Sequence, residues 1–245
     1  MHDRAAAEAR QQLAAARRLH VGRRLGAGGL ALAAALAAVA RELVEDVVGG
    51  DDQGGPDGLA TVEAFDPQAG AWAAVAPMNA PRNVPAVVAV GGMLYALGGY
   101  SRGARQSVEA FDPQTGAWAA LAPMPTARRG AGAAVLDGKI YVVGGFSGIA
   151  FLATVEVYDP ATNAWSQAPP MSTARRSSGV AVLGGKLYAA GGFDGTNEVS
   201  SAEVFDPQTN AWTALAPMST ARSSFAMAAV QGKLYVAGGF AARST

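Results

Sequence analysis

Glutamate and arginine return at fixed places in this chain, and these residue types can carry acid–base chemistry or bind anions. Four glutamates, each 19 residues before a member of an arginine series, are Glu63, Glu109, Glu156 and Glu203; the series is Arg82, Arg128, Arg175 and Arg222. A charge that returns at one place in a packed strand needs a partner, because burying it alone is costly. We therefore predict one structural Glu–Arg pair per unit. The alternative is a ring of arginines that faces a ligand.

Other kinds of reactive centre lack their residues. The chain has no cysteine, which excludes disulfides, thiolate metal sites and cysteine nucleophiles. The only histidines are His2 and His20, so the rest of the chain offers no His-ligated metal centre and no imidazole-dependent triad. The paired glycines follow strand-like runs, but no helix comes after them to bind phosphate. We expect no catalytic residues, no metal and no cofactor.

The composition favours many short strands and gives no basic surface on the main domain. Half of the 245 residues are hydrophobic, and 31 Gly and 13 Pro supply frequent turns. The 19 basic and 19 acidic residues balance, but residues 1–41 hold seven Arg against Asp3 and Glu8. The remainder is therefore acidic by five charges, which argues against a nucleic-acid partner.

A repeat of 46 to 47 residues organises the chain. The tryptophans Trp72, Trp118, Trp165 and Trp212 are spaced by 46, 47 and 47 residues, and the glycine pairs that begin at Gly98, Gly144, Gly191 and Gly238 keep the same spacing. A period in the forties made of strand-like segments is typical of propeller blades with four strands each.

Each unit contains four predicted strands. After Arg128, a small apolar run ends in an Asp-Gly-Lys turn, and the run IYVV stops at two glycines. TVEVYD then alternates with the two-residue period of a strand. The octet FDPQTGAW at 111–118 suits a type I turn followed by a left-handed residue, so we predict a hairpin with Trp at the start of the fourth strand.

Each unit of the sequence resembles the kelch repeat. The resemblance is carried by the Arg, the Tyr before Gly-Gly, the Val/Ala-Glu-Ala/Val-Phe/Tyr-Asp-Pro run, the Ala-Trp and the Pro-Met. The resemblance covers about residues 59–245 and implies an all-β, kelch-type β-propeller. Three complete blades lie at 82–127, 128–174 and 175–221, between two strands at 59–81 and two at 222–245. We predict about four four-stranded blades, closed by pairing of the N-terminal strands with the C-terminal strands. An arc completed by a second copy and a truncated product are the alternatives, so the chain is a monomer or a dimer.

The N-terminal segment differs from the repeats. Residues 1–41 are rich in Ala and Arg and are predicted to be helical, or to be a targeting segment. The apolar run 26–40 is too short for an ordinary membrane span. Residues 42–58 are a Gly/Asp-rich linker or a decayed repeat, in which Glu45 and Asp46 stand where Leu and Tyr should be. We expect a cytoplasmic protein; organelle targeting or export through this segment is the alternative.

Recognition is expected on the connections between blades, because loops on a rigid scaffold carry binding residues. Aromatic residues and Arg dominate interface energetics. The candidates, most of them from the variable loop after the second strand, are Tyr100, Arg102, Arg105, Arg129, Phe146, Ile149, Phe151, Arg176, Phe193, Asp194 and Asn197. The aromatic residue after Gly-Gly recurs in all four copies, so packing is its competing explanation.

The sequence therefore predicts a module that binds an unidentified protein and is not an enzyme. The kelch resemblance implies partners such as actin, or a substrate-recognition role in a ubiquitin ligase. The alternative is a carbohydrate-active propeller, a sugar mutarotase or a lectin-like binder. A deep central pocket lined by Arg and Glu side chains that are not paired to each other would favour that alternative.

Overall fold

The computed structural model describes residues 58–241 and the backbone of residues 45–48, and every regular element in these ranges is a strand. The strands are β1 (Glu45–Val48), β2 (Val62–Asp66), β3 (Ala71–Val75), β4 (Ala86–Val90), β5 (Met93–Leu97), β6 (Val108–Asp112), β7 (Ala117–Leu121), β8 (Gly132–Leu136), β9 (Lys139–Val143), β10 (Val155–Asp159), β11 (Ala164–Ala168), β12 (Gly179–Leu183), β13 (Lys186–Ala190), β14 (Ala202–Asp206), β15 (Ala211–Leu215), β16 (Arg222–Ser223), β17 (Ala226–Val230), β18 (Lys233–Ala237) and β19 (Phe240–Ala241). The all-β prediction is confirmed. The helical prediction for 1–41 lies outside the described residues.

Three complete blades form the centre of the molecule. Their antiparallel sheets have the strand orders β4-β5-β6-β7, β8-β9-β10-β11 and β12-β13-β14-β15, so each blade is a meander. The hairpin between β8 and β9 turns at Asp137 (φ 51°) and Gly138 (φ 75°), because a two-residue turn that matches the strand twist needs positive φ at both positions. The predicted four-stranded unit is thus confirmed.

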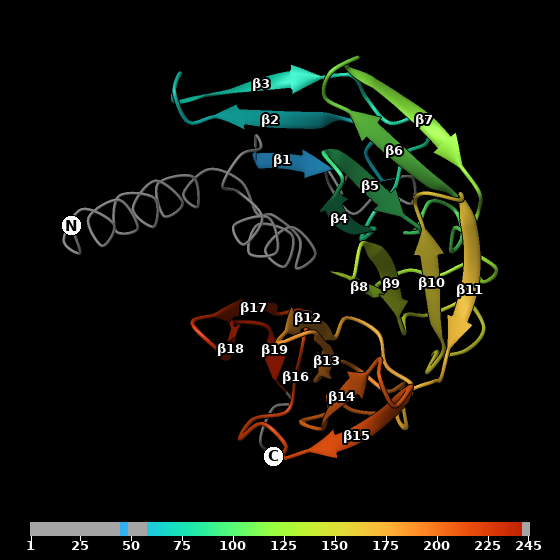
Figure 1. Ribbon diagram of the computed structural model, residues 1–245, viewed down its shortest axis with the longest axis vertical. Helices are drawn as coiled ribbons and strands as arrows, with labels where there is room; N and C mark the ends of the chain where they lie inside the picture. Colours follow the sequence, from blue (N-terminus) through green and yellow to red (C-terminus); the bar gives the residue numbers. More distant parts are fainter. Residues whose placement is uncertain (1–44, 49–57, 242–245) are drawn as a thin grey trace.

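The two ends of the chain do not pair with each other. Instead of β18, β1 lies beside β2 in a three-stranded sheet with β3, and β17 and β18 form a two-stranded sheet. Figure 1 shows the sheets arranged as an open arc, with β2 and β3 separated from β17 and β18. The predicted closure by N-terminal and C-terminal strands is therefore wrong for the described residues. The physical reason is competition for one edge of β2, which β1 already occupies.

The register of β1 identifies its place in the blade. Val48 is opposite Val62 and Val47 is opposite Glu63, just as Val143 is opposite Val155 and Val142 is opposite Glu156 in a complete blade. β1 thus occupies the position of a second strand in a first, less complete blade. Backbone ladders do not depend on side-chain identity, so this pairing persists in spite of the acidic residues in the strand.

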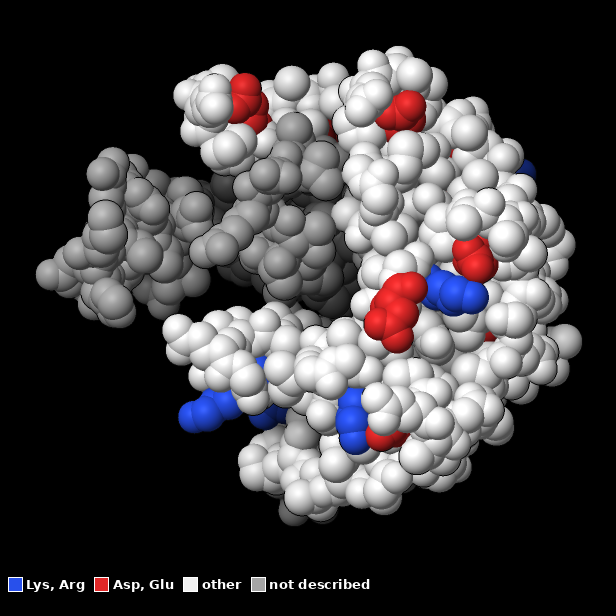
Figure 2. Space-filling view, viewed as in Figure 1, with Lys and Arg blue, Asp and Glu red and all other residues white. Residues whose placement is uncertain are grey.

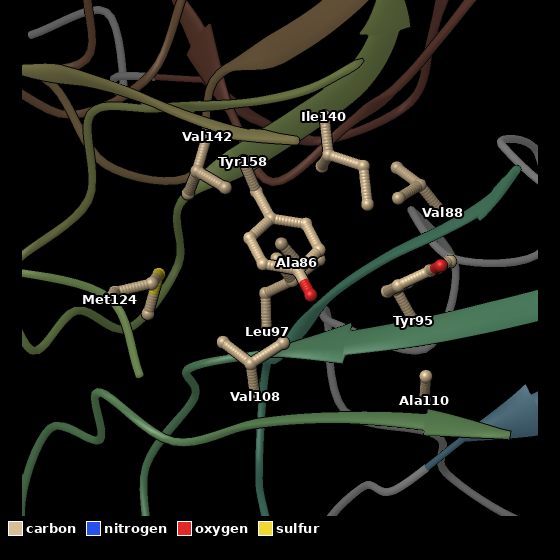
Figure 3. Packing of buried hydrophobic residues seen from close by; sticks show 10 residues of the cluster. All are labelled: Ala86, Val88, Tyr95, Leu97, Val108, Ala110, Met124, Ile140, Val142 and Tyr158. Atoms are coloured by element: carbon tan, nitrogen blue, oxygen red, sulfur yellow. The ribbon is translucent and has the colours of Figure 1, made fainter. Parts of the chain in front are cut away.

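Apolar side chains fill the space between neighbouring blades. Tyr95 and Leu97 of one blade pack with Ile140, Val142 and Tyr158 of the next (Figure 3), and all five are buried. The Tyr95 and Tyr158 rings lie 6.1 Å apart and tilted, a favourable aromatic arrangement. The inward-facing positions of each sheet therefore supply the contact that holds blade to blade.

The repeated tryptophan links consecutive blades. The indole Nε1 of Trp118, Trp165 and Trp212 donates a hydrogen bond of 2.8 Å to a backbone carbonyl of the preceding blade, at Ala76, Ala122 and Pro169 respectively. The predicted hairpin with Trp at the start of the fourth strand is confirmed. It also orients the large ring towards the preceding blade.

A second link runs along the first strands of the blades. Ser177 N donates to Gly130 O (2.7 Å) and Ser224 N donates to Ser177 O (2.8 Å), while Gly130 N donates to Val84 O (3.3 Å). All four residues have positive φ, between 44° and 59°. One residue per blade thus extends a backbone hydrogen-bond chain from each unit to the next.

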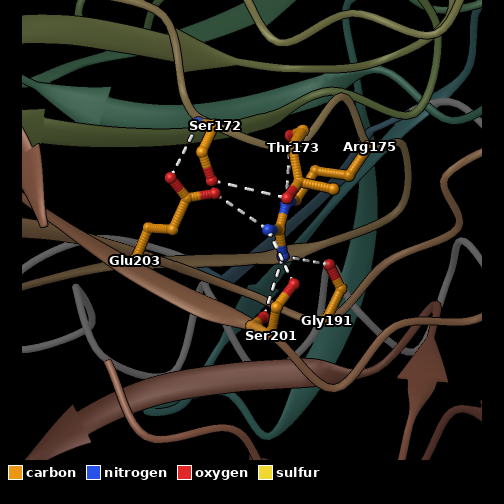
Figure 4. A network of polar contacts seen from close by, with 6 residues as sticks. All are labelled: Ser172, Thr173, Arg175, Gly191, Ser201 and Glu203. Atoms are coloured by element: carbon orange, nitrogen blue, oxygen red, sulfur yellow. Dashed lines mark hydrogen bonds and ion pairs between the residues drawn. The ribbon is translucent and has the colours of Figure 1, made fainter. Parts of the chain in front are cut away.

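The Glu and Arg series form buried pairs in the three complete blades, as predicted, whereas Glu63 is exposed and Arg222 has no carboxylate partner among the described residues. Arg175 donates to Glu203 Oε1 (2.9 Å), to the carbonyls of Gly191 and Ser201 (both 2.9 Å) and to the Ser201 hydroxyl (3.0 Å), while Ser172 N donates to Glu203 Oε2 at 2.8 Å (Figure 4). Burial lowers the pKa of Arg175, and the Glu203 carboxylate opposes that change.

The other complete blades repeat this arrangement. Arg82 pairs with Glu109, and Arg128 Nη2 lies 2.7 Å from Glu156 Oε1, with these side chains almost fully buried. Each Glu therefore pairs with the arginine that precedes it in its own unit. The ring of ligand-facing arginines is wrong for these three residues, since all are 0–1% exposed.

Candidate functional site

Each blade has two ends with different chemistry. At one end lie the connection between the second and third strands and the segment before the first strand; we call this the loop face. At the other end lie the tight turns between the first two and the last two strands; we call this the turn face. The antiparallel order fixes this division, because alternate connections of a meander must lie at opposite ends.

The loop face is built the same way in each complete blade. After the second strand the chain pairs with the segment that precedes the first strand, through the bridges Tyr100–Asn83, Phe146–Arg129 and Phe193–Arg176. The paired glycines allow the chain to turn back towards the segment before the first strand. At Gly144 (φ 65°) an added Cβ would collide with the Arg175 carbonyl, so only glycine fits the close approach. Phe146 and Phe193 are thereby each held next to an arginine, and Tyr100 is held next to Asn83.

Six predicted contact residues from three blades form one continuous stack, the arginine–aromatic row, on the loop face: Tyr100, Arg129, Phe146, Phe151, Arg176 and Phe193. The Arg129 guanidinium carbon lies 4.7 Å from the centre of the Tyr100 ring and 5.3 Å from that of Phe146. The Phe151 ring lies 4.8 Å from Phe146 and 5.6 Å from Phe193. The sequence did not show that these residues from separate loops would join.

Arg176 completes the row. Its guanidinium carbon lies 5.7 Å from the Phe151 ring centre and 5.4 Å from that of Phe193. Burial lowers the pKa of Arg176, and the nearby positive charge of Arg129 lowers it further. Two like charges therefore sit close together on stacked rings, which stabilise cations through their negative faces.

Neither arginine of the row is neutralised by a carboxylate in the part of the chain that the structure describes. The Arg129 Nε is buried and has no hydrogen-bond partner there. The row thus presents unsatisfied positive charge together with aromatic surface. Such a surface suits a ligand that brings both a carboxylate and an apolar group.

The remaining predicted residues lie around the row or support it. Ile149 stands at the tip of its loop, 95% exposed, and Asn197 is exposed in the equivalent loop of the next blade. Asp194 is structural, because its Oδ1 accepts bonds from the amides of Thr196 (2.7 Å) and Asn197 (2.8 Å). These bonds lower the pKa of Asp194.

The two arginines of the first loop differ from each other. Arg102 is exposed and Arg105 is half-buried. Burial lowers the pKa of Arg82, and the positive charge of Arg105 lowers it further. The Arg105 Nε is buried without a hydrogen-bond partner among the described residues. Among the described residues, Arg105 makes no cation–ring contact with the row.

Charge is sparse on the face of the molecule seen in Figure 2, where acidic and basic side chains lie interspersed over a mostly uncharged surface. Within 58–241 no three Asp, Glu, His or Cys side chains group in a way that could hold a metal ion. No helix in the described ranges is long and apolar enough to span a bilayer.

The sequence analysis identified the two strands of the last half-blade but did not treat it as a candidate site. Arg222 and Lys233 belong to the repeated series, yet neither has an ion-pair partner among the described residues. Tyr235 is 52% exposed, whereas the equivalent Tyr95 is 6% exposed. The sequence contained a signal for this site. The last repeat has Arg222 and Lys233, but the given sequence contains no Glu and Asp after them at the repeated spacing.

Comparisons with known proteins agree with this architecture. A family model described as the KLHDC2/KLHL20/DRC7 Kelch-repeats domain matches residues 34–239. Among solved structures, one titled "Structure of YjhT" superposes with a TM-score of 0.66 at 23% sequence identity, over 74% of this chain. The match covers 66% of that chain, slightly less than two thirds of its length, and at this identity it shows the fold alone.

No curated protein matches the chain. The family match spans most of the sequence, from upstream of β1 to the last glycine pair. Domains of this kind generally mediate protein interactions. The chain belongs to the kelch-repeat family and folds as a kelch-type propeller arc.

Proposed function

We propose that this protein is a non-catalytic interaction module that binds a partner protein through the arginine–aromatic row. The observation that carries the proposal is the continuous stack of two arginines and four aromatic rings, contributed by three blades, with no carboxylate on either guanidinium among the described residues. Rigid aromatic anchors lose little entropy on binding, and Arg and aromatic residues supply most interface hot spots.

The chemistry of the row indicates the chemistry of the partner. A partner carboxylate can accept hydrogen bonds from Arg129 or Arg176, and an apolar side chain beside it can pack on Phe151. The exposed side chain of Ile149 extends this surface. We therefore expect the partner to present a segment in which acidic and apolar residues alternate closely.

The buried pairs support a non-catalytic role. Acid–base catalysis needs a titratable group placed in a cleft where it meets substrate. In the three complete blades the repeated Glu and Arg engage each other and are closed to solvent. The carbohydrate-active alternative needs arginines and carboxylates that are free to meet a sugar, so these pairs favour the interaction module.

Substrate recognition for a ubiquitin ligase and attachment to the actin cytoskeleton are the finer roles that we propose for testing. Both suit the cytoplasmic location expected from the sequence. In either role the partner would dock on the loop face, and the turn face would stay free.

Affinity capture with the full chain tests the proposal. The variant Arg129→Ala/Arg176→Ala removes both charges of the row, and Lys139→Ala/Lys186→Ala removes two charges of the turn face as a matched control. We expect a protein retained by the wild type and by the control to be lost from the first variant, with at least about tenfold weaker binding when purified. Identical captured proteins in both variants, or anomerisation of a free sugar by the wild type in an NMR assay, would refute the proposal.

A further inference from the structure

The two-stranded sheet of β17 and β18 is an incomplete blade, and no strand of the described residues lies along its outer edge. In the complete blades the second strand pairs on both sides, for example β13 with β12 and with β14. β18 pairs with β17 in the same register, with Ala237 opposite Ala226, but no described strand lies on its other edge. An edge of free backbone amides and carbonyls is a template for another strand.

The complete blades show which side chains a strand on that edge must carry. The third strand places a Glu opposite Ala189 in β13, where it pairs with Arg175 at 2.9 Å. Three residues later it places an Asp, whose carboxylate pairs with Lys186 at 2.8 Å. The blade before it repeats both pairs, with Lys139 and Asp159 3.0 Å apart.

The last half-blade has both cations, and neither is paired with a carboxylate of the described residues. The Arg222 Nη1 donates to Gly238 O (3.0 Å), as Arg175 does to Gly191 O, but Arg222 is only half-buried and has no carboxylate partner in the described part of the chain. Lys233 is exposed and equally without one. By register, the missing Glu belongs opposite Val236, and the missing aromatic residue belongs opposite Leu234.

Apolar surface lies beside this edge. Tyr235 is 52% exposed, whereas the equivalent Tyr188 of the complete blade is half-buried. Leu234 is half-buried, whereas its equivalent Leu187 is buried. A strand that covered the edge would therefore bury apolar side chains as well as pair two charges and complete a backbone ladder.

We propose that β18 binds, by strand addition, an extended protein segment with the pattern apolar–Glu–apolar–aromatic–Asp. The segment lies antiparallel to β18, with its Glu on Arg222 and its Asp on Lys233. The two charge pairs, three residues apart, fix the register of the segment. This site lies at the end of the arc and is separate from the arginine–aromatic row.

A peptide with the chain's own third- and fourth-strand sequence, SAEVFDPQTNAWTAL (residues 201–215), is the probe. Fluorescein-labelled peptide is titrated into the full chain and followed by anisotropy. We expect saturable binding that weakens about tenfold or more with Arg222→Ala, because a charge-assisted pair is lost. Lys233→Ala should weaken it about two- to threefold, as expected for an exposed pair.

Two controls make the result specific. Lys186→Ala changes the same lysine position in a blade that already has its third strand, so it should leave peptide affinity unchanged. The peptide change E203Q should weaken binding to wild-type protein as much as Arg222→Ala does, which keeps the test valid even if that variant folds poorly. No saturable binding, or equal binding of the E203Q peptide, would overturn the proposal. Light scattering that shows a dimer dispersed by Arg222→Ala would assign the edge to a second copy and overturn the separate partner segment.

Discussion

Removal of Arg175 should cost much of the stability of the domain. The side chain is fully buried, and it donates to Glu203, to two backbone carbonyls and to a hydroxyl, all within 3.0 Å. Arg175→Met keeps much of the apolar volume but leaves a buried carboxylate without its cation. Breaking a buried pair on one side costs about 3–5 kcal/mol, and in a domain of this size such a loss lowers Tm by roughly 10–15 °C.

The cost should depend on the charge that remains. In Arg175→Met/Glu203→Gln the uncompensated charge is gone, and the Gln side chain can still accept from Ser172 N. We therefore expect the double variant to recover at least about 1 kcal/mol relative to Arg175→Met. Recovery should be incomplete, because the carbonyls of Gly191 and Ser201 still lose their donor.

Urea unfolding followed by tryptophan fluorescence measures these differences, since Trp212 lies in the same sheet. Lys186→Ala is the matched control. Its partner Asp206 is equally charged, but Lys186 is 45% exposed, so the unfolding midpoint should move little. A loss below about 1 kcal/mol for Arg175→Met, or a double variant less stable than the single one, would refute the claim that a buried charge pair stabilises each blade.

Three further variants test other parts of the structure. Gly144→Ala should lower the free energy of unfolding by at least about 3 kcal/mol, because the new Cβ meets a neighbouring carbonyl and the residue has positive φ. Gly138→Ala also has positive φ but has open space around it, so it should lower this free energy by only about 1 kcal/mol. Thermal melts measure both, and equal losses would contradict the close approach at Gly144. Trp165→Phe should cost about 1–2 kcal/mol through its lost 2.8 Å bond, and a neutral effect would contradict the link between blades. Lys186→Ala should raise the lowered pKa of Asp206 towards its usual value, as measured by carboxyl ¹³C NMR titration. Because the pKa of Asp206 is lowered in the folded state, the pair with Lys186 stabilises the fold at pH values above the usual carboxyl pKa. This stabilisation is lost as the pH falls through the lowered pKa. An unchanged Asp206 pKa in Lys186→Ala would contradict the pair.

The strands and turns were predictable because their causes are local. Alternation over five residues, Gly-Gly stops and the Asp-Pro turn act within one unit, and four copies of each signal agree. The positive φ of Asn163 (52°) and Gly116 (68°) confirms the left-handed residue expected before the tryptophan. Burial of a repeated charge also implied a partner, so the Glu–Arg pairs followed from residue types and period.

The partner of each Glu and the pairing of the ends could not be predicted in this way. Glu203 lies nearer in sequence to Arg222 than to Arg175, but strand adjacency in the sheet brings it to Arg175. Likewise the pattern of β18 fits β2 better than that of β1 does, yet β1 holds the edge. Contacts between distant segments depend on which strands meet, and a local pattern does not contain that information.

For the candidate site, the sequence supplied the residues but not their assembly. Arg129 and Arg176 were recognisable because each follows a member of the repeated series. Three of the aromatic residues follow a glycine pair, and Phe151 lies in the variable loop after the second strand. That the rings of Phe146, Phe151 and Phe193 would stack across two blades depends on the spacing of the blades around the arc.

The sequence alone determined the repeating unit, its four strands, its turns and its need for a buried ion pair, because periodicity and burial cost act on every copy alike. Only the tertiary structure decided that the arc stays open in the described residues and that none of their strands covers the edge of β18 beside Arg222 and Lys233. It also decided that two arginines and four aromatic rings join into one row. These features arise where one unit meets another, and the packing of blades, not the repeat, sets those distances.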